Sequence, residues 1–279
     1  MSLSFLVLGS SSSGNATLLS CSTPTGERHL LLDAGLGPRT FARRMHMAGL
    51  DPVRLDAIIL THADSDHIRA SWRRTLERES IPVHMPLAHR RDAERDAVPN
   101  HLSRPFSSRF EPVPGVVVDP FEVPHDREGA SAFRITCGDV ALGWATDLGR
   151  VDAGLIEHLR GVNALGIESN YDLERQRTSG RPEFLVRRIT GGRGHLSNRE
   201  CLEAVRQLTR QEAVPGTIEH VVLLHLSRDC NCPELVAGLW ADEAPELVDR
   251  LLISRHDRPI EQLHLGAGAG IREQGLLFG

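Results

Sequence analysis

The chain has 279 residues, of which 40% are hydrophobic and 25% charged, proportions typical of a globular protein with a sizeable core. Its formal net charge of −5 argues against a protein that coats nucleic acid through its overall charge, so phosphate contacts must come from local patches. Apolar runs stay well short of the ~18 residues that cross a membrane. We therefore expect one domain over residues 1–279 and no membrane partner.

The N-terminal residues and the cysteines bear on the compartment. No basic stretch precedes the first apolar run, so the N-terminus predicts a first strand rather than a signal peptide. Five cysteines at irregular spacing argue against a disulfide framework and fit a reducing compartment. Cys230 and Cys232 are close together, but their spacing fits two free thiols better than a metal or redox pair. These features predict a cytoplasmic protein.

The first predicted elements are short strands. Apolar runs at 4–9 and 16–21 are joined by a loop of small residues, which is either a plain turn or a place where backbone approaches a ligand. A third strand at 29–32 ends at Asp33, whose carboxylate could orient a ligand histidine. A helical pattern and a further strand follow, and this order indicates a mixed α/β sheet with helices on its faces.

The predicted strand at 56–61 leads into four potential metal ligands within six residues. His62 and Asp64 alternate as at the end of an extended segment, while Asp66 and His67 lie where the chain turns toward a helix. Imidazole and carboxylate groups packed this closely would repel one another or lack partners without a cation. The pattern favours two metals held side by side over a solvated polar loop.

The rest of the chain alternates predicted helices and strands. The arginine groups in the two helices after the metal loop are interpreted as solvated faces paired with acids, in preference to phosphate binding. Residues 98–115 contain several prolines and predict an irregular connection, and 173–193 are polar and rich in arginine. We expect helices at 39–49, 69–79, 86–97, 198–211 and 233–252, strands at 116–124, 131–137, 140–146, 164–168 and 221–224, and a peripheral strand with a glycine-rich tail at 260–279.

Three more potential ligands directly follow predicted strands, as at the metal loop: His125, Asp147 and His225. Because a carboxylate has two oxygens, Asp147 could bridge two cations. His195 lies on a loop that leads into a predicted helix, where Ser197 or Asn198 can cap the first turn together with Glu200.

These motifs resemble, in the same order, those of the YycJ/WalJ branch of the metallo-β-lactamase superfamily, which is similar to ribonuclease Z and to the cyclic-phosphate phosphodiesterase PhnP. The resemblance covers most of residues 4–240. Its landmarks are the segments 8–15, 32–35, 61–68, 124–126, 146–149, 168–172, 194–198 and 225–227. It implies an α/β fold of the αβ/βα four-layer sandwich type, in which two mixed sheets face each other with helices outside and metals at one edge.

The resemblance also implies a ligand set for two divalent metal ions. One ion would be held by His62, Asp64 and His125, the other by Asp66, His67 and His225, with Asp147 as the bridge. Asp64 stands where a second histidine is usual, and its harder oxygen moves the preference from zinc toward manganese or iron. Tyr171 stands where a histidine would be expected.

Further roles follow from the same resemblance. His195 would protonate the leaving oxygen, since an acid that works near neutral pH needs a pKa close to that of histidine. Asp66 is a second candidate catalytic residue. Asp33 would orient a ligand histidine without binding the metal itself. Candidate substrate contacts are Ser11, Asn15, Asn170 and Ser197.

The expected function is a dinuclear metal-dependent hydrolase of phosphodiester bonds, a nuclease that degrades DNA from an end by attack of hydroxide formed between the ions. The alternative is a small-molecule hydrolase acting on a cyclic phosphate diester, a thioester or a lactone. A deep narrow pocket would favour that alternative, and an open arginine-lined groove would favour nucleic acid. Seven intact ligand positions argue against a non-catalytic binding protein. Aromatic residues are only 4% of the chain, so few platforms for base stacking are expected.

Overall fold

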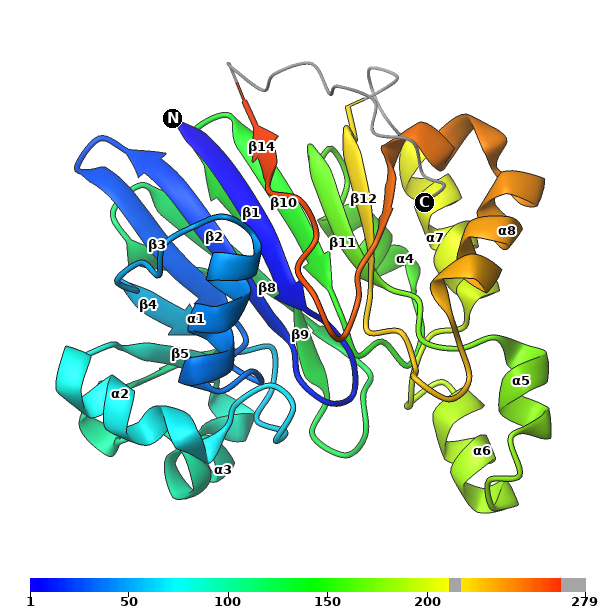
Figure 1. The fold of residues 1–279 in the computed structure, drawn as a ribbon, viewed down its shortest axis with the longest axis horizontal. Helices are drawn as coiled ribbons and strands as arrows, with labels where there is room; N and C mark the ends of the chain where they lie inside the picture. The colour runs from blue at the N-terminus through cyan, green and yellow to red at the C-terminus, as the bar shows by residue number, and fades with distance from the viewer. Residues whose placement is uncertain (211–216, 267–279) are drawn as a thin grey trace.

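The computed structural model describes residues 1–210 and 217–266, and two seven-stranded sheets lie face to face in it (Figure 1). The first sheet has the order β14, β1, β2, β3, β4, β5, β6. Its strands are β1 (Ser2–Gly9), β2 (Ala16–Thr23), β3 (Gly26–Leu32), β4 (Ala57–Ile59), β5 (Val83–Pro86), β6 (Ser103–Phe106) and β14 (Leu263–Leu265). The strands from β14 to β3 pair antiparallel, and those from β3 to β6 pair parallel.

The second sheet repeats this plan, with the order β13, β12, β11, β10, β9, β8, β7. Its strands are β7 (Phe110–Val113), β8 (Val116–Val123), β9 (Ala130–Cys137), β10 (Val140–Ala145), β11 (Ala164–Glu168), β12 (His220–Leu224) and β13 (Leu251–Ile253). Neighbours from β7 to β10 are antiparallel and those from β10 to β13 are parallel. Each sheet is therefore mixed, as expected.

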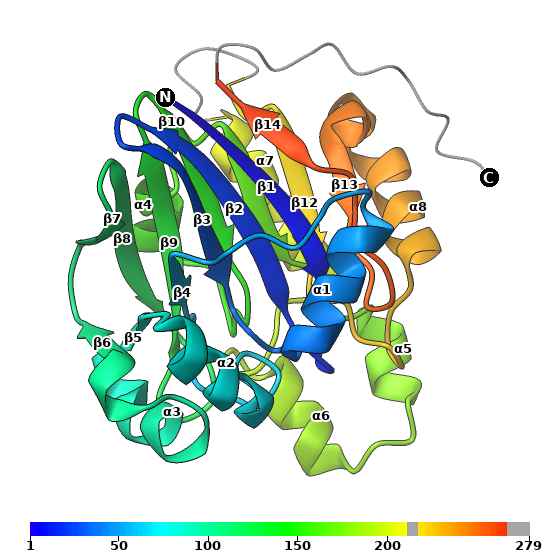
Figure 2. The same ribbon diagram turned by 60° about the vertical axis from the view of Figure 1, so that its left-hand side comes forward.

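Helices cover the outer faces of both sheets (Figures 1 and 2). The first sheet carries α1 (Pro38–Met47), α2 (Arg73–Glu79) and α3 (Arg90–Asp96), and the second carries α4 (Ala153–His158), α7 (Asn198–Arg210) and α8 (Pro233–Glu243). Two more helices, α5 (Leu173–Thr178) and α6 (Glu183–Thr190), project from one end of the second half. Short 3₁₀ turns lie at Ala70–Trp72, Leu87–His89, Asn100–Leu102 and Pro245–Arg250. None of the described helices is long and apolar enough to cross a membrane.

Strand alternation explains why the layers form. Leu3, Phe5 and Val7 of β1 point into the core between the sheets, while Leu6 and Leu8 point to the core beneath the outer helices. The second sheet has its own outer core under α4, α7 and α8. Three buried layers of apolar side chains thus separate four layers of structure, which confirms the expected αβ/βα sandwich.

Two expectations about elements were wrong, and two helices were not expected. Residues 98–115 are not an irregular connection but contain β6 and β7, and both strands include a proline. β6 and β7 lie at the sheet edges, where a missing backbone N–H is tolerated. The predicted helix at 233–252 ends early, because Ala244 precedes a proline and leaves the helical region (φ −139°, ψ 55°). The polar segment 173–193 holds α5 and α6.

The glycine-rich tail expected after residue 266 lies outside the described residues, whereas its peripheral strand is β14. The five cysteines, all within the described ranges, are free thiols, so the expectation for Cys230 and Cys232 is confirmed.

Candidate metal centre

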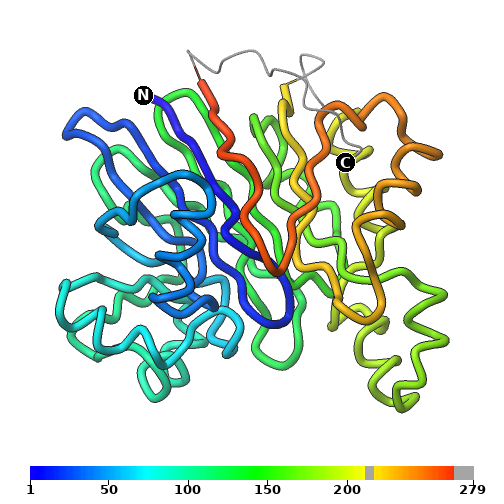
Figure 3. The backbone as a smooth tube through the Cα atoms, viewed as in Figure 1, coloured from blue at the N-terminus to red at the C-terminus, as the bar shows by residue number. Residues whose placement is uncertain are grey.

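The predicted ligands meet where strands of the two sheets end. The dark-blue turn after β1 and the green turn between β8 and β9 come together at this end of the molecule (Figure 3). Asp33, Asp147 and His225 follow β3, β10 and β12 in the left-handed backbone conformation, with φ of 58°, 56° and 55°. Such a conformation is uncommon outside glycine, and here it turns the chain sharply at the strand ends.

Four buried histidines share one arrangement, in which the Nδ1 atom is bound to the protein. His67 Nδ1 donates to Asp33 Oδ2 at 2.9 Å, His125 Nδ1 to the Gly194 carbonyl at 2.9 Å, His225 Nδ1 to Glu168 Oε1 at 2.8 Å, and His62 Nδ1 lies 3.1 Å from Thr61 Oγ1. A carbonyl or carboxylate oxygen can only accept, so the proton of the three rings that face one is on Nδ1. Their Nε2 atoms then carry the lone pair that can bind a cation, and that of His67 also lies 3.0 Å from Asn15 Nδ2.

Each Nε2 atom faces a carboxylate. The distances are 3.8 Å for His62 to Asp64, 3.1 Å for His67 to Asp147, 3.7 Å for His125 to Asp147 and 3.5 Å for His225 to Asp66. His225 Nε2 is buried and makes no hydrogen bond to any described residue. A buried nitrogen with no partner beside a carboxylate oxygen fits a metal ligand, so the donor set suits divalent ions.

The ligand atoms form two clusters. His62, Asp64 and His125 offer atoms that all lie within 4.8 Å of one another, and so do Asp66, His67 and His225. Asp147 lies between them, with Oδ2 3.1 Å from His67 Nε2 of the second cluster and Oδ1 3.7 Å from His125 Nε2 of the first. These are the two sets that the sequence resemblance implied.

Electrostatics in the centre favours cations. Burial would raise the pKa of Asp147, but the charges of His225 and His67 outweigh it and hold that pKa well below its usual value. Burial lowers the pKa of His62 well below the usual value for histidine, which favours its neutral form. The neighbouring carboxylates outweigh burial at His67 and His225 and raise their pKa values, so a cation bound there would displace a proton. Asp64 is the most exposed of the ligands, with a side chain 57% exposed.

Glu168 is a site residue that the sequence interpretation did not assign. It ends β11, is fully buried, and its Oε1 accepts from the Nδ1 atoms of His195 and His225, each at 2.8 Å. Its Oε2 accepts backbone N–H groups of Leu148 at 2.7 Å and Leu196 at 3.1 Å. An acid at the end of a buried strand was the available signal. These bonds hold Glu168, His195 and His225 together, and Asp147 also offers a ligand atom within 4.8 Å of theirs.

His195 lies beside the two clusters. Its ring centre is 5.2 Å from that of His125 and 5.1 Å from that of His225, and its side chain is 22% exposed. Burial would lower the pKa of His195, but the charge and hydrogen bond of Glu168 outweigh it and raise the pKa. With Nδ1 bound to Glu168, its Nε2 atom is free to carry a proton toward a substrate.

The four candidate substrate contacts are buried and already bonded to the protein. Asn15 Nδ2 lies 3.0 Å from His67 Nε2, and Asn170 Nδ2 donates to the His225 carbonyl at 2.7 Å. Ser11 donates its backbone N–H to Asn15 at 3.1 Å. Ser197 and Glu200 form the predicted capping box at the start of α7. This bonding supports a bracing role for these residues, and their contact with substrate stays a prediction.

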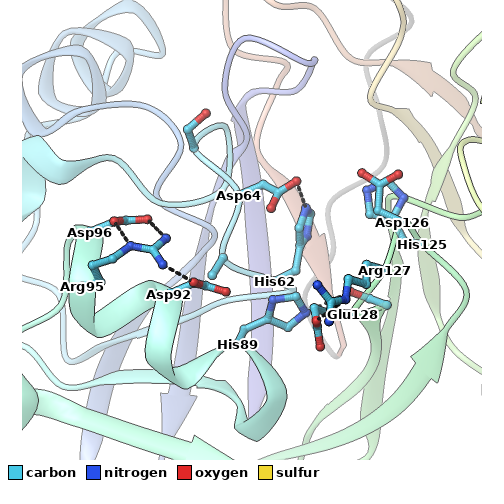
Figure 4. A pocket seen from close by; sticks show the side chains of 13 residues that line it. His62, Asp64, His89, Asp92, Arg95, Asp96, His125, Asp126, Arg127 and Glu128 are labelled. Atoms are coloured by element: carbon cyan, nitrogen blue, oxygen red, sulfur yellow. Dashed lines mark hydrogen bonds and ion pairs between the residues drawn. The ribbon is translucent and has the colours of Figure 1, made fainter. Parts of the chain in front are cut away.

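Two clefts flank the metal loop. One, of about 330 Å³, has His62 and Asp64 at its centre, with Arg95 of α3 on one side and Asp126 and Arg127 on the other (Figure 4). The second, of about 450 Å³, is lined by the serine loop after β1, the segment from Ser65 to Ser71, and Asp96. Arginine pairs with acids on exposed α3, as predicted for a solvated face: Arg90 with Glu94, and Arg95 with Asp92 and Asp96.

Comparison with known proteins finds matches over most of the chain. A family model described as a beta-lactamase superfamily domain matches residues 28–218. The chain is 30% identical over 239 residues to the exodeoxyribonuclease YycJ of Bacillus anthracis. The aligned region covers 84% of this chain and 86% of that protein.

Solved structures share the fold at lower identity. A diphosphatase from the PhnP family superposes with a TM-score of 0.64 at 16% identity, covering 95% of this chain and 98% of that one. The short form of human tRNase Z superposes with a TM-score of 0.53 at 15% identity, covering 94% and 99%. Since the family model spans more than half of the sequence and YycJ matches most of it, the chain belongs to the metallo-β-lactamase superfamily of hydrolases, in the family of YycJ.

Proposed function

We propose that this protein is a dinuclear metal-dependent phosphodiesterase that degrades DNA from an end, as the name of its YycJ relative suggests. The observation that carries the proposal is the set of four histidine Nε2 atoms that face carboxylates in two clusters around Asp147. Two adjoining cation sites are the arrangement that phosphodiester hydrolysis uses most often.

Each side chain has a defined task in this proposal. Two divalent ions would supply a nucleophile by lowering the pKa of a coordinated water, and would neutralise phosphate oxygens. Asp147 would contribute one carboxylate oxygen to each site. Glu168 fixes the His195 ring through Nδ1, so that Nε2 can give its proton to the leaving oxygen. Asp66 would act as ligand and catalytic residue, with Oδ2 3.6 Å from His67 Nε2.

The proposed ions are zinc or manganese, with iron as a further candidate. Asp64 adds a hard oxygen ligand to the first cluster, and carboxylate-rich sites suit manganese better than imidazole-rich ones do. We also propose a cytoplasmic location, which the free thiols support because disulfides are rare in that compartment.

The test is digestion of single- and double-stranded DNA labelled at the 5′ or 3′ end, after loading the purified protein with manganese or zinc. We expect products that shorten from one end, cleavage that weakens as salt rises, and hydrolysis of bis-p-nitrophenyl phosphate. The control is Asp147→Ala, which should lose both activities together with bound metal. Hydrolysis of lactones or thioesters without cleavage of any phosphodiester would overturn the proposal in favour of a small-molecule hydrolase.

A further inference from the structure

Helices α5 and α6 form an arm that stands outside the four layers, at the end of the molecule where the metal centre lies (Figures 1 and 2). Residues 172–193, which contain this arm, include six arginines and three acidic residues, whereas the whole chain has a net charge of −5. The arm is therefore a local basic surface in an acidic protein. Such a surface complements a polyanion.

The exposed face of α6 carries an aromatic ring between arginines. Phe184 is 69% exposed, more than any other large hydrophobic side chain in the described ranges, and α6 buries none of its own side chains. Arg187 and Arg188 are three and four residues further on, so they share a face with Phe184. One exposed hydrophobic side chain alone indicates no ligand, but a ring between cationic side chains offers a stacking face together with partners for phosphate.

The C-terminal end of α6 is fixed to the metal centre. Arg188 Nε donates to Asp126 Oδ1 at 2.9 Å, and Asp126 lines the cleft over the first cluster. Next along the chain, the backbone N–H of His195 donates to the Ile189 carbonyl at 2.9 Å. Phe184 is thus one helical turn from a residue that reaches the rim of the cleft.

We propose that Phe184 is a stacking platform for a nucleobase of single-stranded DNA whose backbone enters the cleft over the metal centre. A flat, exposed ring beside cationic side chains is the usual way in which proteins hold single strands without reading their sequence. Arg187 pairs with Glu183 on the exposed surface at 3.0 Å, and exposed pairs are weak enough to be exchanged for a phosphate. This inference rests on the proposed function and specifies that the site binds its DNA substrate in single-stranded form.

The experiment compares Phe184→Ala, Phe184→Tyr and the wild type. Phe184→Ala should raise the KM for single-stranded DNA about 5- to 100-fold, the range for loss of one base stack, and Phe184→Tyr should restore it. The kcat/KM for bis-p-nitrophenyl phosphate should stay unchanged, since this substrate has no base to reach α6. The matched control is Met47→Ala, which removes another exposed side chain (53%) on α1, away from the arm.

Abasic substitutions locate the stacked base. Moving one abasic site along the strand should weaken binding to the wild type at one position, and should not weaken binding to Phe184→Ala further at that position. An unchanged KM in Phe184→Ala, or an equal loss on blunt duplex DNA, would overturn the stacking role while leaving the nuclease proposal intact. A wild type that cleaves no DNA would instead overturn the proposed function.

Discussion

At the scale of single residues, Glu168 decides what His195 can do. One carboxylate oxygen receives the Nδ1 protons of both His195 and His225, so the free Nε2 atom of each ring points elsewhere. For His225 that atom lies 3.5 Å from Asp66 Oδ2, whereas the His195 side chain is 22% exposed. One buried acid therefore orients both rings, which suits the two tasks proposed for them: metal binding for His225 and proton transfer for His195.

His195→Ala should keep its metal content, because the two clusters supply ligands without it. Its kcat should fall by roughly 10²- to 10⁴-fold for DNA, whose leaving alkoxide needs a proton, and much less for bis-p-nitrophenyl phosphate. Steady-state kinetics on both substrates, with metal analysis of the same samples, measures this difference. If a folded, metal-loaded variant slowed equally on both substrates, His195 would not be the acid.

Sequence patterns could single out the seven candidate ligands because each follows the end of a predicted strand or lies in the metal loop. Glu168 was missed as a site residue because it is the last residue of its strand, whereas the other candidates come after their strands. In the sequence, a buried acid at that position looks the same as an ordinary polar residue that ends a strand. The hydrogen bonds that connect Glu168 to His195 span 27 positions in the chain, and no local pattern encodes them.

At the scale of elements, the two sheets are joined where the chain passes from β6 to β7. Phe106 and Phe110 stack there with ring centres 4.6 Å apart, and the ring of His84 on β5 stacks on Phe110 at 4.9 Å. Burial, assisted by the charge of Arg104, lowers the pKa of His84 to about 4. The folded state therefore holds a neutral imidazole in this aromatic stack.

This histidine should make stability depend on pH. Because its folded pKa lies below the unfolded value near 6.5, its contribution is complete above pH 6.5 and is lost as pH falls toward 4. The loss should reach roughly 2–3 kcal/mol of unfolding free energy by pH 4.5. Urea unfolding at pH 7 and 4.5 should show a smaller loss for His84→Gln than for the wild type, and the same loss in both proteins would contradict a buried neutral His84.

Elements were predictable where a core-facing pattern was present. The alternating strands β1, β2 and β9 follow such a pattern, whereas the edge strands β6 and β7 contain prolines that sequence interpretation takes as loop signals. Helix α6 buries nothing and α5 buries only Gln176, so neither shows the apolar face by which helices are recognised.

At the scale of the whole molecule, the metal centre connects the two sheets. The loop from 62 to 67 follows β4 of the first sheet, while His125, Asp147 and His225 follow strands of the second. Cations bound there would hold both sheets through ligands from each. Without them, Asp64, Asp66 and Asp147 would remain close together in a partly buried space.

Removal of metal should therefore lower thermal stability. With each of two ions at about 100 times its Kd, binding contributes about 2.7 kcal/mol per site and about 5 kcal/mol in all, which for a chain of this size corresponds to a Tm shift of roughly 10 °C. Calorimetry before and after dialysis against a chelator, with readdition of manganese, measures the shift. The Tm of Asp147→Ala should change little on chelation. If the Tm of the wild type did not change either, bound ions would not join the two sheets.

The pairing of β14 with β1 has a consequence for synthesis. Leu263 lies opposite Phe5, so β1 is completed by a strand that is synthesised about 250 residues later. At 5–20 residues per second, β1 waits roughly 13–50 s for this neighbour. A product that terminates before Leu263 would carry β1 as a bare edge strand, open to pairing with other chains. Chains truncated in this way should therefore aggregate or bind chaperones, although they keep every proposed ligand of the metal centre.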